Sequence, residues 1–231
     1  DLIGGGRNSR NHAERLGFGS VERVQSAFFT TTFSIMGFIA KADGKITKDE
    51  IRMAEQVMLQ MNLNSHQRSI AINLFNEGKK SDFPAEEVLI QFKKECIRRR
   101  NLIQMFLEIQ ISTALSDGYL HKNEKRFLEN IAHDLGFEKY QFDSLLARLR
   151  GYAHFEDENS VIKKLEAAYE LLGVKRNCSE QDLKKAYRKQ MNQHHPDKLV
   201  AKGLPDEMIE IATQKTQDIK AAYEFIKNER S

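Results

Sequence analysis

The chain has 231 residues, of which 40% are hydrophobic and 30% are charged, a length sufficient for one large or two small domains. Its 36 Lys and Arg residues nearly balance 33 Asp and Glu residues, which excludes a protein coated in positive charge for general nucleic-acid binding. The 3 Pro and 13 Gly residues are too few for a collagen-like or proline-rich disordered chain. The 2 Cys residues cannot build a disulfide framework and suit a reducing compartment.

The beginning of the chain predicts a flexible lead. Residues 1–19 are rich in Gly and have no apolar period, so we expect them to be flexible. The first residue is Asp1, and we interpret the chain as a fragment whose targeting segment would lie upstream. The most apolar stretch, residues 28–40, is shorter than the roughly 20 residues that a membrane span needs. It also carries several hydroxyl side chains, and we therefore expect a buried core helix there.

Residues 20–152 predict one all-helical domain of about seven helices, because apolar residues recur there at helical spacing. Three such faces are Ile51, Ala54, Val57, Met58 and Met61; Leu102, Met105, Phe106, Ile109 and Ala114; and Phe127, Leu128, Ile131 and Leu135. The sequence contains no alternating run of β-branched residues, so we do not expect a sheet. A break is expected at Gly151, and the partly acidic stretch 153–164 is expected to be a linker to a second domain.

An internal repeat divides this first domain into two halves. Residues 42–50 (ADGKITKDE) and residues 116–124 (SDGYLHKNE) share the pattern Asp-Gly-X-Ile/Leu-X-X-X-Glu. The pattern matches half of an EF-hand calcium loop, but the other half would place Ile39 and Lys41 at ligand positions, so a standard EF-hand is excluded. Two interpretations stay open. Either each Glu lies in the first turn of the next helix, or a weak cation site forms. Its ligands would be Asp43, Glu50, Asp117 and Glu124.

An all-helical duplicated domain with twin Asp-Gly…Glu turns resembles the TerB-like domain of tellurite resistance. The resemblance implies a helical bundle and supplies no catalytic residue. Some members of that family are associated with metal binding, which leaves a metal-responsive stress module as an alternative function. Binding to anionic membranes is a further alternative, because one cluster of basic residues is opposed by a single acid. A solvated helix face explains this cluster as well. The cluster is Lys93, Lys94, Arg98, Arg99 and Arg100.

The segment 165–231 carries the most specific functional signal. Ser179 is a good N-cap for a helix that runs to about His194 and that has no acid after Leu183. Its basic residues are Lys184, Lys185, Arg188 and Lys189. Pro196 must end this helix, and Pro205 begins another one. The sequence therefore predicts two antiparallel helices joined by a loop that carries His195-Pro196-Asp197-Lys198.

Four motifs occur in this segment in an order that closely resembles the J domain of DnaJ-type co-chaperones. They are Tyr169…Leu171-Leu172-Gly173-Val174, Leu183…Ala186-Tyr187-Arg188-Lys189, His195-Pro196-Asp197-Lys198 and Ile219…Ala221-Ala222-Tyr223-Glu224. The resemblance implies a co-chaperone that binds an ATP-bound DnaK-type chaperone and stimulates its ATP hydrolysis. It implies neither a catalytic residue nor a cofactor, and the sequence offers no nucleophile–base pair or phosphate loop.

The resemblance also implies which residues bind the chaperone. They are His195, Pro196, Asp197, Lys184, Lys185, Arg188, Lys189 and Lys198. We expect the basic helix to steer an acidic partner surface and Asp197 to receive an Arg or backbone donors from the partner. Tyr187 is expected to belong to the core. His194 and His195 are not expected to form a metal pair, because adjacent side chains at a helix end diverge.

The order of the two domains resembles the DjlA type of bacterial DnaJ-like proteins. That family carries an N-terminal membrane anchor and faces the cytoplasm. The resemblance implies a full-length protein at the cytoplasmic side of the bacterial inner membrane, with the J domain at residues 165–231. The TerB-like domain would then recruit a client, a membrane protein or, as a homodimer, a second copy of the chain.

Overall fold

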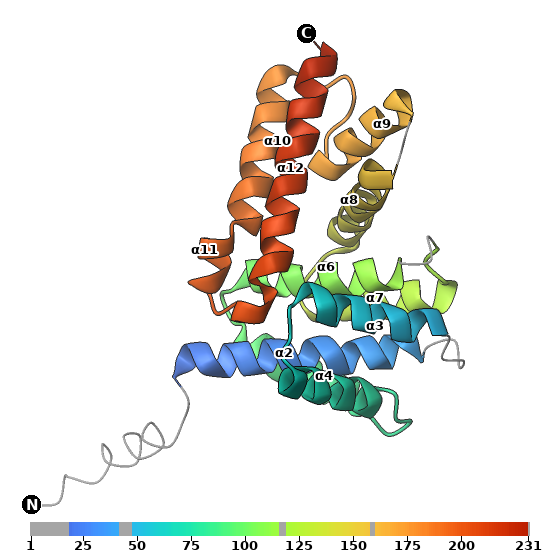
Figure 1. Cartoon of the computed structure of the whole chain (residues 1–231), viewed down its shortest axis with the longest axis vertical. Helices are drawn as coiled ribbons and strands as arrows, with labels where there is room; N and C mark the ends of the chain where they lie inside the picture. The colour runs from blue at the N-terminus through green and yellow to red at the C-terminus, as the bar shows by residue number, and fades with distance from the viewer. Residues whose placement is uncertain (1–18, 42–47, 116–118, 158–159, 231) are drawn as a thin grey trace, which may run out of the picture.

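The computed structural model describes residues 19–41, 48–115, 119–157 and 160–230, which form helices and turns with no strand among them (Figure 1). The first helices are α2 (Ser20–Ala40), α3 (Lys48–Gln60), α4 (Ser65–Gly78), α5 (Ala85–Glu95), α6 (Arg100–Ala114), α7 (Lys122–Asp134) and α8 (Lys139–Asp157). They are followed by α9 (Val161–Leu172), α10 (Glu180–His194), α11 (Pro196–Val200), the 3-10 turn η1 (Asp206–Met208) and α12 (Ile209–Arg230). The all-α class predicted from the sequence is confirmed.

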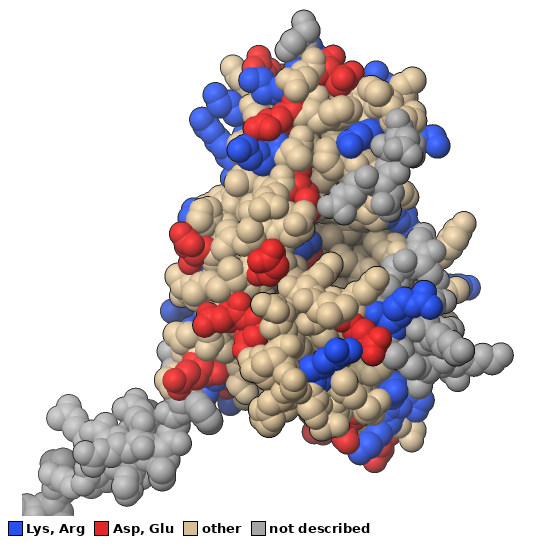
Figure 2. Space-filling view, viewed as in Figure 1, with Lys and Arg blue, Asp and Glu red and all other residues tan. Residues whose placement is uncertain are grey.

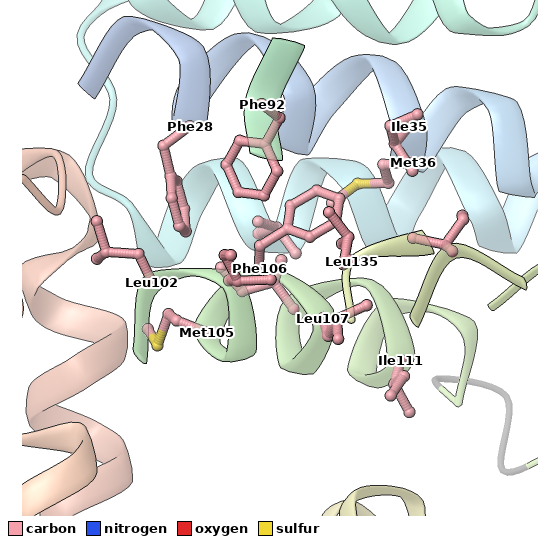
Figure 3. Packing of buried hydrophobic residues seen from close by; sticks show 14 of the residues in the cluster. Phe28, Ile35, Met36, Phe92, Leu102, Met105, Phe106, Leu107, Ile111 and Leu135 are labelled. Atoms are coloured by element: carbon pink, nitrogen blue, oxygen red, sulfur yellow. The ribbon is translucent and has the colours of Figure 1, made fainter. Parts of the chain in front are cut away.

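Helix α2 lies at the centre of the first domain and packs against α4, α5 and α6. Its Phe28 ring meets the rings of Phe92 and Phe106 edge-on, with centroids 5.9 and 6.5 Å apart (Figure 3). The buried hydroxyl of Thr32 donates to the Phe28 carbonyl at 2.7 Å, so a polar group inside this apolar helix keeps a hydrogen bond. The expected core helix is confirmed. In the described ranges, no helix is long and apolar enough to cross a membrane.

Helices α9, α10 and α12 form a second core, in which α10 and α12 lie side by side. Its fully or almost fully buried members include Ala168, Leu171, Leu172, Leu183, Ile219, Ala222 and Ile226. Tyr187 of α10 stacks on Tyr223 of α12 with centroids 4.3 Å apart, and it is half-buried at the margin of this core. These contacts make α10 and α12 a stable pair that carries the candidate site.

The expected break at Gly151 is absent, because α8 continues through this residue to Asp157. A β-carbon at Gly151 would lie 2.6 Å from the backbone nitrogen of Leu171 and 2.8 Å from the carbonyl oxygen of Ala167. The glycine therefore lets α9 pack closely on α8 and does not open a hinge. Residues 153–157 and 161–164, expected as linker, are helical for the same reason: α8 and α9 pack against each other.

The end of the C-terminal hairpin that follows α10 is joined to the first domain. Leu199, Leu204, Met208 and Ala212 are fully buried and belong to the same core cluster as the side chains of α2 and α6. Gln25 of α2 donates to the Leu204 carbonyl at 3.5 Å. The two domains thus share one core at this end, which the sequence patterns did not predict.

Candidate functional site

Helix α10 is fixed at its start by its own side chains. The Ser179 hydroxyl accepts a hydrogen bond from the Asp182 backbone N–H at 3.1 Å, as the predicted N-cap requires. Glu180 and Asp182 lie in the first turn, where the helix dipole favours negative charge. The acids of α10 are therefore confined to its beginning, and the surface that leads to the following motif is left to basic residues.

Four basic side chains line the exposed surface of α10 beyond this first turn. They are Lys184, Lys185, Arg188 and Lys189. None of them forms an ion pair or hydrogen bond with another residue that the structure describes. Figure 2 shows basic side chains gathered over the part of the molecule where Figure 1 places α10. The predicted basic helix face is present, and its charges are available to a partner.

The His-Pro-Asp motif begins where α10 ends. His195 leaves the helical conformation, with φ −58° and ψ 122°, and Pro196 occupies the first position of the short helix α11. The sequence predicted a loop here, but Lys198 and Leu199 both donate their backbone N–H to the His195 carbonyl at 3.1 Å, which closes a helical turn. Proline at the first position favours this turn because its φ is already helical.

The side chains of the motif differ in exposure. His195 and Pro196 are half-buried, whereas Asp197 and Lys198 are exposed. The Asp197 carboxylate has no hydrogen-bond or ion-pair partner within the described part of the chain, and Lys198 donates to the side-chain oxygen of Asn192. Asp197 therefore follows the end of α10 in the chain with an exposed carboxylate that no described residue binds.

His194 points away from this surface and into the interface with the first domain. Its Nε2 lies 3.0 Å from both carboxylate oxygens of Glu108 in α6, and its Nδ1 lies 3.0 Å from the carbonyl oxygen of Gln190. Both neighbours of the ring are hydrogen-bond acceptors, so each ring nitrogen of His194 faces a group to which an N–H can donate. Lys215 of α12 makes a second ion pair with Glu108 at 3.1 Å. His194 thus joins α10 to α6, and through Glu108 to α12.

Glu108 and Lys215 were not predicted as site residues. Glu108 is 2% exposed and is the single charged residue of α6 after Arg100, which was the available signal in the sequence. Burial alone would raise the pKa of its carboxyl. The charges of His194 and Lys215, with hydrogen bonds from His194 and Gln104, instead hold that pKa well below its ordinary value of 4.5. Glu108 is therefore ionised in the folded chain.

Comparison with known proteins identifies both halves of the chain. The family model for tellurite resistance protein TerB matches residues 30–147, and the model for the DnaJ domain matches residues 167–231. Co-chaperone protein DjlA of Shewanella oneidensis is 47% identical over 213 residues, which cover 92% of this chain and 81% of that protein. The chain belongs to the DjlA family of co-chaperone proteins.

Two further members of the DjlA family show the same extent of similarity. Co-chaperone protein DjlA of Photobacterium profundum is 43% identical over 239 residues, covering 98% of this chain and 83% of that protein. Its counterpart in Escherichia coli is 43% identical over 225 residues, covering 92% and 83%. No solved structure matches the chain. The J domain and the TerB domain that the sequence motifs indicated are thereby confirmed.

Most residues of the cation site considered for the two Asp-Gly…Glu repeats are not among those that the structure describes. Asp43 and Asp117 lie outside the described ranges, and the Glu50 side chain is not described either. Glu124 is buried, and its carboxylate accepts the His121 backbone N–H at 3.0 Å at the start of α7. This contact is the helix-start role considered for Glu124. Among the described side chains, no group of three metal-ligating residues lies together.

The basic cluster considered for membrane binding is mostly engaged with the protein itself. Lys93 donates to the Asp134 carbonyl at 2.6 Å, and Arg99 donates to the Glu95 carbonyl at 3.2 Å. Arg100 donates to the side-chain oxygen of Gln141 at 3.0 Å. These contacts favour the interpretation of the cluster as a solvated helix face that also stabilises helix ends.

The low pKa of Glu108 predicts an acid-sensitive contribution to stability. The folded pKa lies below the unfolded one, so the unfolded chain binds the proton more readily and stability falls as pH falls below about 4.5. We expect Glu108→Gln to lower the melting temperature at pH 7 and the difference from the native chain to shrink between pH 5 and pH 3. Thermal unfolding followed by circular dichroism at each pH measures this. A difference independent of pH would contradict the prediction.

Proposed function

We propose that this chain binds the ATP-bound state of a DnaK-type chaperone through α10 and the His-Pro-Asp motif and stimulates its ATP hydrolysis. The observation that carries the proposal is the exposure of charged side chains both on α10 and in the motif that follows it. Four basic side chains of α10 and the carboxylate of Asp197 are exposed and form no ion pair or hydrogen bond with another described residue. The surface lies in the part of the chain that matches the DnaJ domain of this DjlA-family member.

The charges of this surface favour a partner with a complementary arrangement. Basic groups on one face of a rigid helix accelerate encounter with an acidic patch and orient it. Asp197 offers its carboxylate to an Arg or to backbone N–H groups of the partner, and such charge-assisted hydrogen bonds are stronger than neutral ones. Half-buried Pro196 fixes the backbone beside that carboxylate, which reduces the ordering cost of binding. The chain acts on a chaperone without performing chemistry itself.

The setting of this activity in the full-length protein is part of the same proposal. The domain order supports a protein anchored in the bacterial inner membrane with these domains on the cytoplasmic side. The TerB domain would bring a client or membrane protein to the chaperone, or pair with a second copy of the chain. In this arrangement the J domain triggers ATP hydrolysis where the TerB domain has gathered the substrate.

A steady-state ATPase assay tests the proposal. The purified chain is titrated into a DnaK-type chaperone at low and at moderate salt, and phosphate release is measured. We expect saturable stimulation of several-fold at low salt and a higher half-saturating concentration at moderate salt, because salt screens the charges on α10. The basal rate of the chaperone alone at each salt concentration is the control. Absence of stimulation at both salt concentrations would contradict the proposed function.

A further inference from the structure

The J domain contacts the first domain at two separated places. Helix α9 packs along α8, and the chain from α11 to the start of α12 shares the first core. Between these contacts lies a groove of about 700 Å³, lined by α3, α6, α8 and α12. Figure 2 shows the molecule hollowed between its upper and lower parts. The orientation of the J domain is therefore set at these two places, and the contacts nearest the His-Pro-Asp motif lie at one edge of the groove.

A buried ionic cluster forms this edge. Glu108 and His194 have side chains that are 2% and 3% exposed, and Lys215 is 12% exposed and lines the groove. Gln104 donates to the same carboxylate at 2.8 Å. The Lys215 ammonium also lies 4.8 Å from the centre of the Tyr152 ring. One carboxylate of α6 thus holds the last residue of α10 and a residue of α12 at the same time.

Further contacts hold the chain on both sides of the motif. Asn101, at the start of α6, donates to the Gln193 carbonyl at 3.3 Å. Beyond α11, Gly203 adopts φ +94°, and a β-carbon there would lie 2.9 Å from a methyl carbon of Val24 in α2. Gln67 of α4 donates to the carboxylate of Glu207. The residues before and after the motif are therefore both held by helices of the TerB domain.

We propose that Glu108 is a positioning residue for the co-chaperone reaction. By pairing with His194, the neighbour of His195, it fixes the end of α10 and sets the direction in which the His-Pro-Asp surface faces relative to the TerB domain. The two domains then act as one body, and a partner held by the TerB domain meets the chaperone in one defined geometry. This inference rests on the proposed function for its consequence but not for its geometry.

The geometry can be measured without any chaperone. Spin labels are attached at exposed Asn73→Cys in α4 and exposed Ala221→Cys in α12, and the distance between them is measured by pulsed electron resonance. Cys178 is replaced by Ser, whereas Cys96 is retained because its thiol is fully buried and burial raises its pKa to about 12. We expect one narrow distance distribution in the native chain and a broader or displaced one in Glu108→Ala.

A second variant and a matched control make the result specific. Glu108→Gln keeps the side-chain volume and an acceptor for His194 but lacks the charge. It is the variant to measure if Glu108→Ala fails to fold, and we expect its distance distribution to broaden less than that of Glu108→Ala. Glu129→Ala removes a carboxylate of α7 that pairs with Lys125 and Lys139, both within the TerB domain, and it should leave the distribution unchanged. A narrow, native distribution in a folded Glu108→Ala or Glu108→Gln variant would overturn the inference.

The ATPase assay supplies the functional readout. With Glu108→Gln we expect the half-saturating concentration to rise at least about threefold, while the maximal stimulation at saturation falls by a smaller factor. Without the ion pair between Glu108 and His194, the end of α10 is held less firmly, but the residues of the His-Pro-Asp surface are unchanged. Kinetics identical to those of the native chain would overturn the positioning role. Failure of the native chain to stimulate would instead contradict the proposed function and leave the distance measurement to decide the geometry.

Discussion

Asp197→Asn should reduce the stimulation of a DnaK-type ATPase by at least about tenfold while leaving the fold of the chain unchanged. The carboxylate is exposed and binds no other described residue, so the fold loses little when its charge is removed. A hydrogen bond to a charged group is worth about 1.5–3 kcal/mol, and about 1.4 kcal/mol corresponds to a factor of ten in binding. Phosphate release at a fixed, subsaturating concentration of the chain measures the loss.

His195→Gln should give the same result for a related reason. The Nδ1 atom of His195 is buried without a hydrogen-bond partner among the described residues, so the fold makes no use of it. Asp206→Asn is the matched control, since Asp206 is an exposed acid of η1, outside the motif, and this variant should stimulate fully. Melting temperatures within about 2 °C of the native value would establish that the variants are folded. Full stimulation by Asp197→Asn or His195→Gln would contradict the role of the motif.

The parts of this site that the sequence predicted are those with local causes. The Ser179 hydroxyl accepts a hydrogen bond from the backbone N–H of Asp182, only three residues along the chain. Pro196 ends α10 because its ring removes the backbone N–H that the helix would need. The basic face of α10 follows from helical periodicity in one short window. Such signals act within a few residues of one another, so they can be recognised without knowing which helices pack together.

The interface between the domains could not be predicted in this way. The pair formed by Glu108 and His194 joins residues that are 86 positions apart. Gly151 was expected to break the chain because glycine is a poor helix former, but close packing of α9 outweighs that propensity. Likewise Leu199 and Leu204 are apolar residues near a proline, and the sequence alone does not reveal which core they enter. Contacts of this kind depend on the whole fold.

Gly37→Ala should destabilise the chain more than any surface substitution, although alanine is the better helix former by about 1 kcal/mol. A β-carbon at Gly37 would lie 2.0 Å from the carbonyl oxygen of Phe75 in α4. The reciprocal position is as close, because a β-carbon at Gly78 would lie 1.8 Å from the carbonyl oxygen of Ser34 in α2. Since these neighbours are backbone atoms, relief requires the two helices to separate.

We expect Gly37→Ala to lose about 3 kcal/mol or more, which corresponds to a fall of roughly 6–12 °C in melting temperature. Thermal unfolding measures this, with Gly19→Ala as the control, because the nearest atom to a β-carbon there is a side-chain oxygen of Glu22 at 3.8 Å. A native melting temperature for Gly37→Ala would contradict the close crossing. Helix α2 also contacts Gly203 and Leu204 of the J domain. Displacing α2 would therefore disturb the contacts that hold the His-Pro-Asp motif as well as the core. Stimulation of the chaperone ATPase should then fall at temperatures where the variant is still folded.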